Sequence, residues 1–260
     1  MKDKPIKIVG VIPAHLASVR FPRKILFPFY GLPMIEHVRR RALLCKALSD
    51  VHVATCNQEI ADQIIKFGGK VIMTSDQHRN GTSRVAEAVR NIDCTHVMLL
   101  QGDEPLLLPR HLDRIIEVID SDPRGDAWNA TGPIDNEDEL DRHSFVKCAV
   151  TSGNRILYCF RRTPCYSIFE TQKSFIRKIL GIIVFRKEFL IELTSLSASP
   201  IEQAEFIEQM RIIENGYVLR SVPVSHSLPS VNEPNEAGTV LEYIKGDSEQ
   251  RQLLEQIVAQ

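Results

Sequence analysis

This 260-residue sequence lacks several features that would point to common classes of protein. No G-x-G-x-x-G turn follows the first apolar run, IKIVGVIP (6–13), which argues against a Rossmann dehydrogenase. The formal net charge is −1, so the chain has no overall attraction to nucleic acid or to an anionic membrane. No apolar run approaches the ~20 residues that cross a bilayer, and no signal-peptide core precedes the first strand. We therefore expect no nucleic-acid partner and no membrane insertion.

The six cysteines are scattered, with no C-x-x-C pair and no zinc-binding spacing with histidine. Their arrangement indicates reduced thiols, which favours a cytoplasmic protein. A hydrophobic fraction of 43% with 25% charged residues is ordinary for a globular chain with a sizeable core.

Strand-like and helix-like segments alternate through the first half of the chain. Apolar runs at 6–13, 51–55, 70–74 and 96–105 are separated by helical patterns at 33–48, 58–69 and 81–92. This alternation predicts an α/β fold, with a mostly parallel mixed sheet and helices on both faces.

The second half adds four strand-like runs and a capped helix over 199–216. The runs lie at 127–134, 145–150, 155–162 and 179–186. Because no linker rich in proline, glycine and serine separates the halves, we expect one domain over 1–260, made of the halves 1–125 and 126–260.

Charged residues follow two of the predicted strands. The loop VIPAHLASVRFPRK (11–24) carries Arg20 and Lys24 after the first strand, and QGDEP (101–105) carries Asp103 after the fourth. Ligands of parallel sheets bind outside the carboxyl ends of the strands, so the two groups should converge. Arginine and lysine suit phosphate, and a carboxylate suits Mg²⁺. The residues alone also fit a solvated loop and an ordinary turn.

The same residues carry a resemblance to a known family. VIPAHLASVRFPRKIL resembles the P-A-R-x-x-S-x-R-x-P-G-K-P-L signature of the CMP-Kdo synthetases (3-deoxy-manno-octulosonate cytidylyltransferases). QGDEP is identical to the metal-site motif of that family, and VIMTSDQHRNGTSRVAEAV resembles its M-T-x-x-x-H-x-S-G-T-x-R-x-A-E segment. The similarity continues through FVKCAV, ILYCFRR, ILGIIVFR and SPIEQAEFIEQMRIIENG, and it covers nearly the whole chain in order.

The resemblance implies a nucleotide-diphospho-sugar transferase (Rossmann-like) fold with a defined activity. That activity is transfer of CMP from CTP to an acidic sugar, 3-deoxy-manno-octulosonate (Kdo), with release of pyrophosphate, for lipopolysaccharide precursor synthesis. It also implies Mg²⁺ as cofactor and a homodimer. The half 1–125 would bind the nucleotide, and the half 126–260 would bind the sugar and form the dimer.

The resemblance also assigns roles to individual residues. The catalytic residues would be Arg20, Lys24 and Asp103, and the Mg²⁺ ligands Asp103 and Asn232. The nucleotide contacts would be Pro13, Ala14, His15, Arg20, Lys24, His78, Thr82, Arg84, Gln101 and Gly102. The sugar contacts would be Arg161, Glu208 and Gln209.

Four positions depart from the family pattern. The family arginine after Pro-Ala is His15, which is neutral for much of the time near pH 7. A glycine is replaced by Arg23, a sugar-side histidine by Ile179, and the second metal-binding aspartate by Asn232. The uncharged amide of Asn232 leaves a missing carboxylate that Glu233 or Glu236 would have to replace.

Three functions are therefore open. The chain is a cytidylyltransferase for Kdo, a cytidylyltransferase for a different acid such as an amino-Kdo, or a degenerate homologue that binds nucleotide or a partner without turnover. The presence of Arg20, Lys24 and Asp103 favours catalysis.

Overall fold

The structure, a computed structural model, describes residues 5–259. The chain forms two compact units: Met1–Asp113 with Leu228–Gln260, called unit 1, and Arg114–Ser227, called unit 2. Unit 2 is thus inserted into the sequence of unit 1. This division differs from the expected halves at 125 and 126, because the C-terminal segment packs with the first half of the chain.

Unit 1 contains a parallel sheet in the order β6–β1–β4–β5. Its strands are β1 (Ile8–Ala14), β4 (Asp50–Thr55), β5 (Lys70–Met73) and β6 (His96–Leu100). The central strand β1 pairs with β4 on one side, where Ile12 lies opposite Val53, and with β6 on the other, where Val11 lies opposite Leu99. A short hairpin of β2 (Pro28–Phe29) and β3 (Leu32–Pro33) stands apart from this sheet.

Three helices connect these strands: α1 (Met34–Leu43), α2 (Gln58–Lys66) and α3 (Gly81–Ala88). From β1 to β4 to β5 the chain moves in one direction across the sheet, and from β5 to β6 it moves back past β1. Since such crossovers are right-handed, α1 and α2 cover one face and α3 covers the other. A fourth helix, α4 (Pro109–Ser121), begins at Pro109 as the sequence predicted. The expected α/β fold is confirmed.

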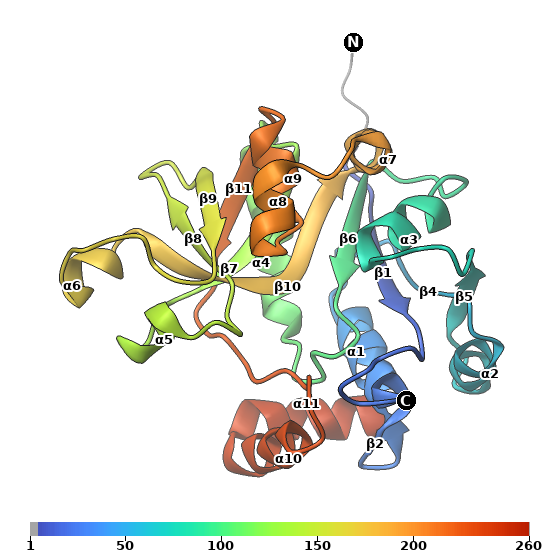
Figure 1. Ribbon diagram of the computed structural model, residues 1–260. Helices are drawn as coiled ribbons and strands as arrows, with labels where there is room; N and C mark the ends of the chain where they lie inside the picture. Colours follow the sequence, from blue (N-terminus) through green and yellow to red (C-terminus); the bar gives the residue numbers. More distant parts are fainter. Residues whose placement is uncertain (1–4, 260) are drawn as a thin grey trace. The chain divides into compact units, whose positions relative to one another are not determined.

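The last two helices, α10 (Glu236–Gly246) and α11 (Ser248–Val258), lie next to α1 (Figure 1). Val240 and Ile244 of α10 share a buried cluster with Phe29 and Met34. The guanidinium of Arg40 on α1, itself buried, donates to the Ile257 carbonyl at 2.6 Å. These contacts explain why the C-terminal segment belongs to unit 1.

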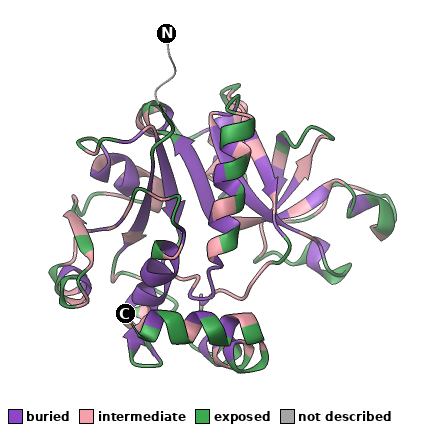
Figure 2. Cartoon of the chain, turned by 180° about the vertical axis from the view of Figure 1, so that it is seen from behind, coloured by how far each residue is buried: buried purple, intermediate pink, exposed green. Residues whose placement is uncertain are grey.

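Unit 2 is a mixed arrangement of five strands: β7 (Ala127–Gly132), β8 (Lys147–Val150), β9 (Ile156–Phe160), β10 (Ile176–Arg186) and β11 (Leu219–Pro223). β7 pairs in parallel with β11, and the pairings β7–β10, β10–β8 and β8–β9 are antiparallel. The helices are α5 (Asp138–Asp141), α6 (Phe169–Gln172), α7 (Lys187–Ser195), α8 (Pro200–Glu205) and α9 (Gln209–Glu214). In Figure 2 the strands are largely buried, and the helices carry exposed outer faces.

The predicted single helix over 199–216 is wrong, because the chain breaks it into α8 and α9. The expected capping box is present at Ser199 and Glu202. The break lies at Phe206, whose φ of 57° is left-handed. The guanidinium of Arg161 donates to the carbonyls of Glu205 and Phe206 at 2.9 and 3.3 Å, and so holds this turn.

Across residues 5–259, no helix combines the length and the apolar character that a membrane span requires.

Candidate functional site

The strand order of unit 1 reverses between β1 and β6, which is where open α/β sheets bind their ligands. The carboxyl end of β1 leads into the loop 15–23, and that of β6 leads into the turn 101–105. Both predicted groups of charged residues therefore start from neighbouring strands at this point. The topology explains why the loop and the turn meet.

Lys24 and Asp103 form an ion pair at this edge of the sheet. The Lys24 Nζ lies 2.6 Å from Asp103 Oδ2, and the side chains are 14% and 23% exposed. Gly102 lets Ile25, the residue after Lys24, pack close to the turn that carries Asp103, because a Cβ at position 102 would lie 3.1 Å from the Ile25 Cδ1. The C-terminal segment joins the pair: Lys24 also donates to the Val231 carbonyl at 3.2 Å, and the Val231 amide donates to the Asp103 carbonyl at 3.0 Å.

These contacts bring Asn232, the second predicted metal ligand, next to the first. Its Nδ2 donates to Ser230 Oγ at 3.1 Å. The carboxylate of Glu236 accepts the amides of Asn232 and Glu233 at 2.5 and 3.0 Å, so one of its oxygens is already bound to the turn before α10. Within the described part of the chain, no three His, Cys, Asp or Glu side chains form a metal-binding group. A cation at Asp103 would therefore draw most of its ligands from substrate and water, as Mg²⁺ commonly does.

His15 lies where the loop leaves β1. Its Nδ1 accepts the amide proton of Ala17 at 3.2 Å, so the neutral ring carries its proton on Nε2. Partial burial, and then the positive charges of Arg84 and Lys24, lower the pKa of His15 below its ordinary value of 6.5. His15 is therefore a neutral donor at pH 7, as expected, whereas Arg20 is an exposed permanent cation in the same loop.

Arg23 adopts a left-handed backbone, with φ 61° and ψ 19°. This conformation is free of steric cost for glycine and costs about 1–2 kcal/mol for another residue. Its guanidinium pairs with Glu59 of α2. The charge of Arg23 is thus paired with a carboxylate of the protein. The family pattern has glycine at this position because the backbone there is left-handed.

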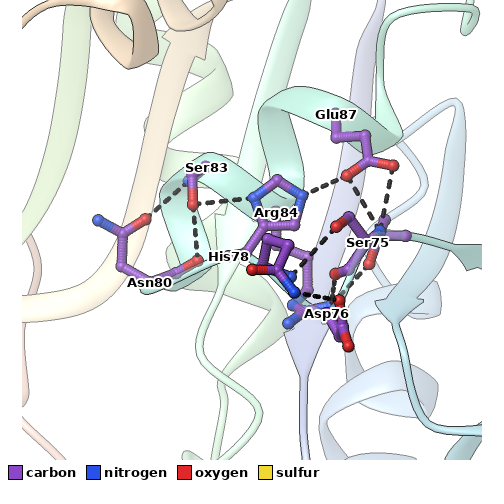
Figure 3. A network of polar contacts seen from close by, with 9 residues as sticks. Ser75, Asp76, His78, Asn80, Ser83, Arg84 and Glu87 are labelled. Carbon is purple, nitrogen blue, oxygen red and sulfur yellow. Dashed lines mark hydrogen bonds and ion pairs between the residues drawn. The ribbon is translucent and has the colours of Figure 1, made fainter.

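A second polar network fixes the segment between β5 and α3 (Figure 3). His78 bridges two residues of α3, with Nδ1 at 3.1 Å from Ser83 Oγ and Nε2 against Glu87. The hydrogen bond from His78 lowers the pKa of Glu87. The buried Arg84 donates to Thr74 Oγ1 at 2.6 Å and to the Ser75 carbonyl at 3.2 Å. The hydrogen bonds of His78 and Arg84 therefore hold the segment between β5 and α3 against α3.

The same segment lies against the end of β1. A Cβ at Gly81, the first residue of α3, would lie 2.9 Å from the Pro13 ring. The helix that contains Thr82 and Arg84 therefore begins in close contact with Pro13. Of the other predicted nucleotide contacts, Ala14 and Gly102 are buried and Gln101 is exposed.

The predicted sugar contacts lie in unit 2, around the turn between α8 and α9. Arg161 donates to the carbonyls of Glu205 and Phe206 at one side of this turn and to the His143 carbonyl, at 3.0 Å, on the other. Glu208 precedes α9 and Gln209 begins it. The Gln209 amide donates to Asn129 Oδ1 on β7 at 3.1 Å.

Comparisons with known proteins agree with this architecture. The family model for cytidylyltransferases matches residues 9–222. A 3-deoxy-manno-octulosonate cytidylyltransferase of Geobacter metallireducens is 33% identical over 248 residues, which cover 91% of this chain and 97% of that protein. The enzyme of the same name from Chlorobium limicola is 38% identical over 236 residues, covering 89% and 95%.

This chain belongs to the 3-deoxy-manno-octulosonate cytidylyltransferase family.

Solved structures extend the likeness to three dimensions. A CMP:2-keto-3-deoxy-manno-octonic acid synthetase complexed with CTP aligns with a TM-score of 0.87 at 32% identity, covering 92% of this chain and 99% of that one. A cytidylyltransferase from Leptospira borgpetersenii, at 17% identity and a TM-score of 0.65, shares the fold.

Several residues that support the site in this family member were not predicted from the sequence. Val231 takes part through its backbone, and any residue type offers a carbonyl oxygen there. Asn80 was detectable, because Asn before a helix is a capping signal; its Oδ1 accepts the Ser83 amide at 2.9 Å. Glu87, the partner of His78, lies within the family-like segment but was not singled out.

Proposed function

We propose that this chain is a cytidylyltransferase that transfers CMP from CTP to 3-deoxy-manno-octulosonate and releases pyrophosphate. The observation that carries the proposal is the Lys24–Asp103 pair at the switch point of the sheet, in a chain of this family. A cation for phosphate and a carboxylate for a metal meet there without a glycine-rich phosphate loop. That combination suits transfer from a nucleoside triphosphate.

The reaction needs positioning and charge neutralisation more than covalent help from the protein. The anomeric hydroxyl of the sugar forms a bond to the α-phosphorus of CTP, the bond to the bridging oxygen breaks, and pyrophosphate leaves with that electron pair while the hydroxyl proton is released. Lys24, Arg20 and the neutral His15 are the donors that the loop presents to the phosphates. Lys24 balances the charge of Asp103 in the chain alone, and it would turn to the triphosphate when CTP binds.

The cofactor in this proposal is Mg²⁺, and the residues present suit it. Asp103 supplies one hard carboxylate and Asn232 an amide oxygen, while phosphates complete such a site. When bound, Mg²⁺ would neutralise charge on the phosphates and on the leaving pyrophosphate. One contact supports this pairing of ligands: the Asp103 carbonyl accepts the Val231 amide, so the backbone connects Asp103 to the segment of Asn232.

The proposal also covers the oligomeric state, the cellular location and the pathway of the enzyme. Unit 2 exposes the apolar side chains of Leu157, Tyr166, Ile168 and Phe206, which are candidates for the contact in a homodimer. The six cysteines are unpaired, as a reducing cytoplasm would keep them. The product would serve as a precursor for lipopolysaccharide.

The test is pyrophosphate release by the full chain with CTP, Mg²⁺ and a panel of acidic sugars. We expect release with Kdo. Release only with another acid, such as an amino-Kdo, would identify a different acceptor, and the chain would still be a cytidylyltransferase. If no acid supports release while CTP still raises the melting temperature, the chain binds nucleotide without turnover and the proposal is wrong.

A further inference from the structure

Arg177 on β10 was not among the expected sugar contacts, yet it is a half-buried cation of unit 2 with no ion-pair partner among residues 5–259. Its Nε donates to Thr131 Oγ1 at 3.0 Å and its Nη2 to the Thr131 carbonyl at 3.2 Å. These bonds hold the guanidinium against β7 but use only two of its five N–H groups. The two protons on Nη1 have no partner within residues 5–259.

No carboxylate in the described chain pairs with Arg177. The one titratable group that interacts with it electrostatically is the Cys148 thiol, whose pKa burial raises to about 12, so that it is neutral at pH 7. Burial also lowers the pKa of Arg177 itself. The next residue is a contrast: Lys178 is paired with Asp135 and Glu139 at 2.8 and 2.9 Å. A half-buried cation without a counter-ion gains when an anion arrives.

The position of Arg177 connects it to the predicted sugar contacts. Side chains alternate along a strand, so Arg177 and Ile179 share one face of β10 and Lys178 lies on the other. Ile179, which replaces the sugar-side histidine of the family pattern, is opposite Thr131 in the register. Thr131 and Asn129 in turn share one face of β7, and Asn129 accepts the hydrogen bond of Gln209.

Arg161, the cation that the resemblance assigns to the sugar carboxylate, is engaged differently. Three backbone carbonyls occupy its Nε, Nη1 and Nη2, and its own amide donates to the Glu205 carboxylate at 3.3 Å. Its guanidinium therefore holds the α8–α9 turn in shape. Of the two arginines, Arg177 has the donors on Nη1 to offer and no acidic neighbour to compete for them.

We propose that Arg177 receives the carboxylate of the acidic sugar and so determines that the acceptor must be an acid. This inference rests on the proposed function and adds to it a residue for acceptor specificity. A guanidinium binds a carboxylate through two parallel N–H···O bonds from two different nitrogens, and Nη1 together with the second proton of Nη2 can make this contact. Arg177 thereby takes the place of the histidine that is missing at position 179, since it lies two residues earlier on the same face of β10.

The experiment compares two acceptors, the acidic sugar and its methyl ester, in the full-length enzyme. In the wild type we expect the acid to be preferred in kcat/KM. Arg177→Met should raise the KM for the acid about 10- to 100-fold, leave the KM for CTP unchanged and abolish the preference for acid over ester. Arg177→Lys should restore part of that preference. Arg161→Met is the matched control, and it should keep the preference even if it lowers kcat.

Two outcomes would overturn the inference. One is an Arg177→Met enzyme that folds, by its melting temperature and circular dichroism, and still prefers the acid as the wild type does. The other is loss of the preference in Arg161→Met alone. If the wild type releases no pyrophosphate with any acid, the proposed function fails instead. Calorimetric titration of the acidic sugar into the protein then decides about Arg177: binding by wild type and not by Arg177→Met supports its role, and equal binding refutes it.

Discussion

The buried ring of His37 should make the stability of the protein fall in mild acid. His37 lies on α1 with no exposed surface, and its Nε2 is 2.7 Å from the Phe29 carbonyl. A carbonyl only accepts, so Nε2 carries the proton, and Nδ1 is buried without a partner among the described residues. Burial first, and then the charges of Arg41 and Arg40, lower the pKa of His37 to about 4, against the hydrogen bond that the ring donates to the Phe29 carbonyl, which raises it.

The sign and size of the effect follow from the two pKa values. The ordinary value is 6.5 and the folded value is about 4, so the unfolded chain binds the proton more readily. The contribution of neutral His37 is therefore complete above pH 6.5 and is lost as the pH falls towards 4. Its full extent is about 3 kcal/mol, of which about 2 kcal/mol is lost between pH 7 and pH 5.

Urea unfolding at pH 7 and pH 5 measures this loss. The comparison variant is His37→Gln, whose side-chain amide can donate to the Phe29 carbonyl but does not titrate. We expect the wild type to lose about 2 kcal/mol more than the variant between the two pH values. Equal losses in both proteins, with the variant folded at pH 7, would refute the reasoning and show that His37 is hydrated or charged in the folded state.

Three further predictions concern the site of unit 1. Asp103→Asn keeps the shape but removes the charge that Lys24 balances; pyrophosphate release should fall at least about 100-fold, and near-normal turnover in a folded variant would contradict the assigned role. His15→Arg introduces a permanent cation at the end of β1 and should lower the KM for CTP, whereas a higher KM in a folded variant would show that the neutral ring has its own contact. Asn232→Asp should lower the Mg²⁺ concentration needed for half-maximal rate, since a second carboxylate joins Asp103; an unchanged metal titration would place Asn232 outside the metal site.

The strands and most helices could be predicted because their signals are local. The apolar runs of β1 and β6, and the capping box at Ser199 and Glu202, lie within a few residues of the structure they specify. The residues after the strands predicted that a cation and a carboxylate would meet. The strand order that places β6 beside β1 is not written in any local pattern, so the sequence predicted only that the two groups share the carboxyl edge of the sheet.

The unpredicted features depend on contacts between distant residues. The helix pattern over 199–216 is regular, and the break at Phe206 is held by Arg161, which lies on another element. The return of the C-terminal segment uses the Ile257 carbonyl, for which no residue type is required. At Arg23, a glycine in the family pattern is a sign of a left-handed residue, but the arginine in this sequence conceals it.

The insertion of unit 2 into unit 1 has a consequence for how the protein forms on the ribosome. All of the inserted unit, Arg114–Ser227, is synthesised before the first residue of Leu228–Gln260. Until α10 arrives, Phe29 and Met34 lack part of their apolar surroundings, and until Ile257 arrives Arg40 lacks its carbonyl. The segments of unit 2 are therefore all synthesised together, whereas unit 1 has to wait for the segment that begins at Leu228. Nascent chains should therefore expose the apolar surface around Phe29 and Met34 to chaperones and proteases until α10 has been synthesised.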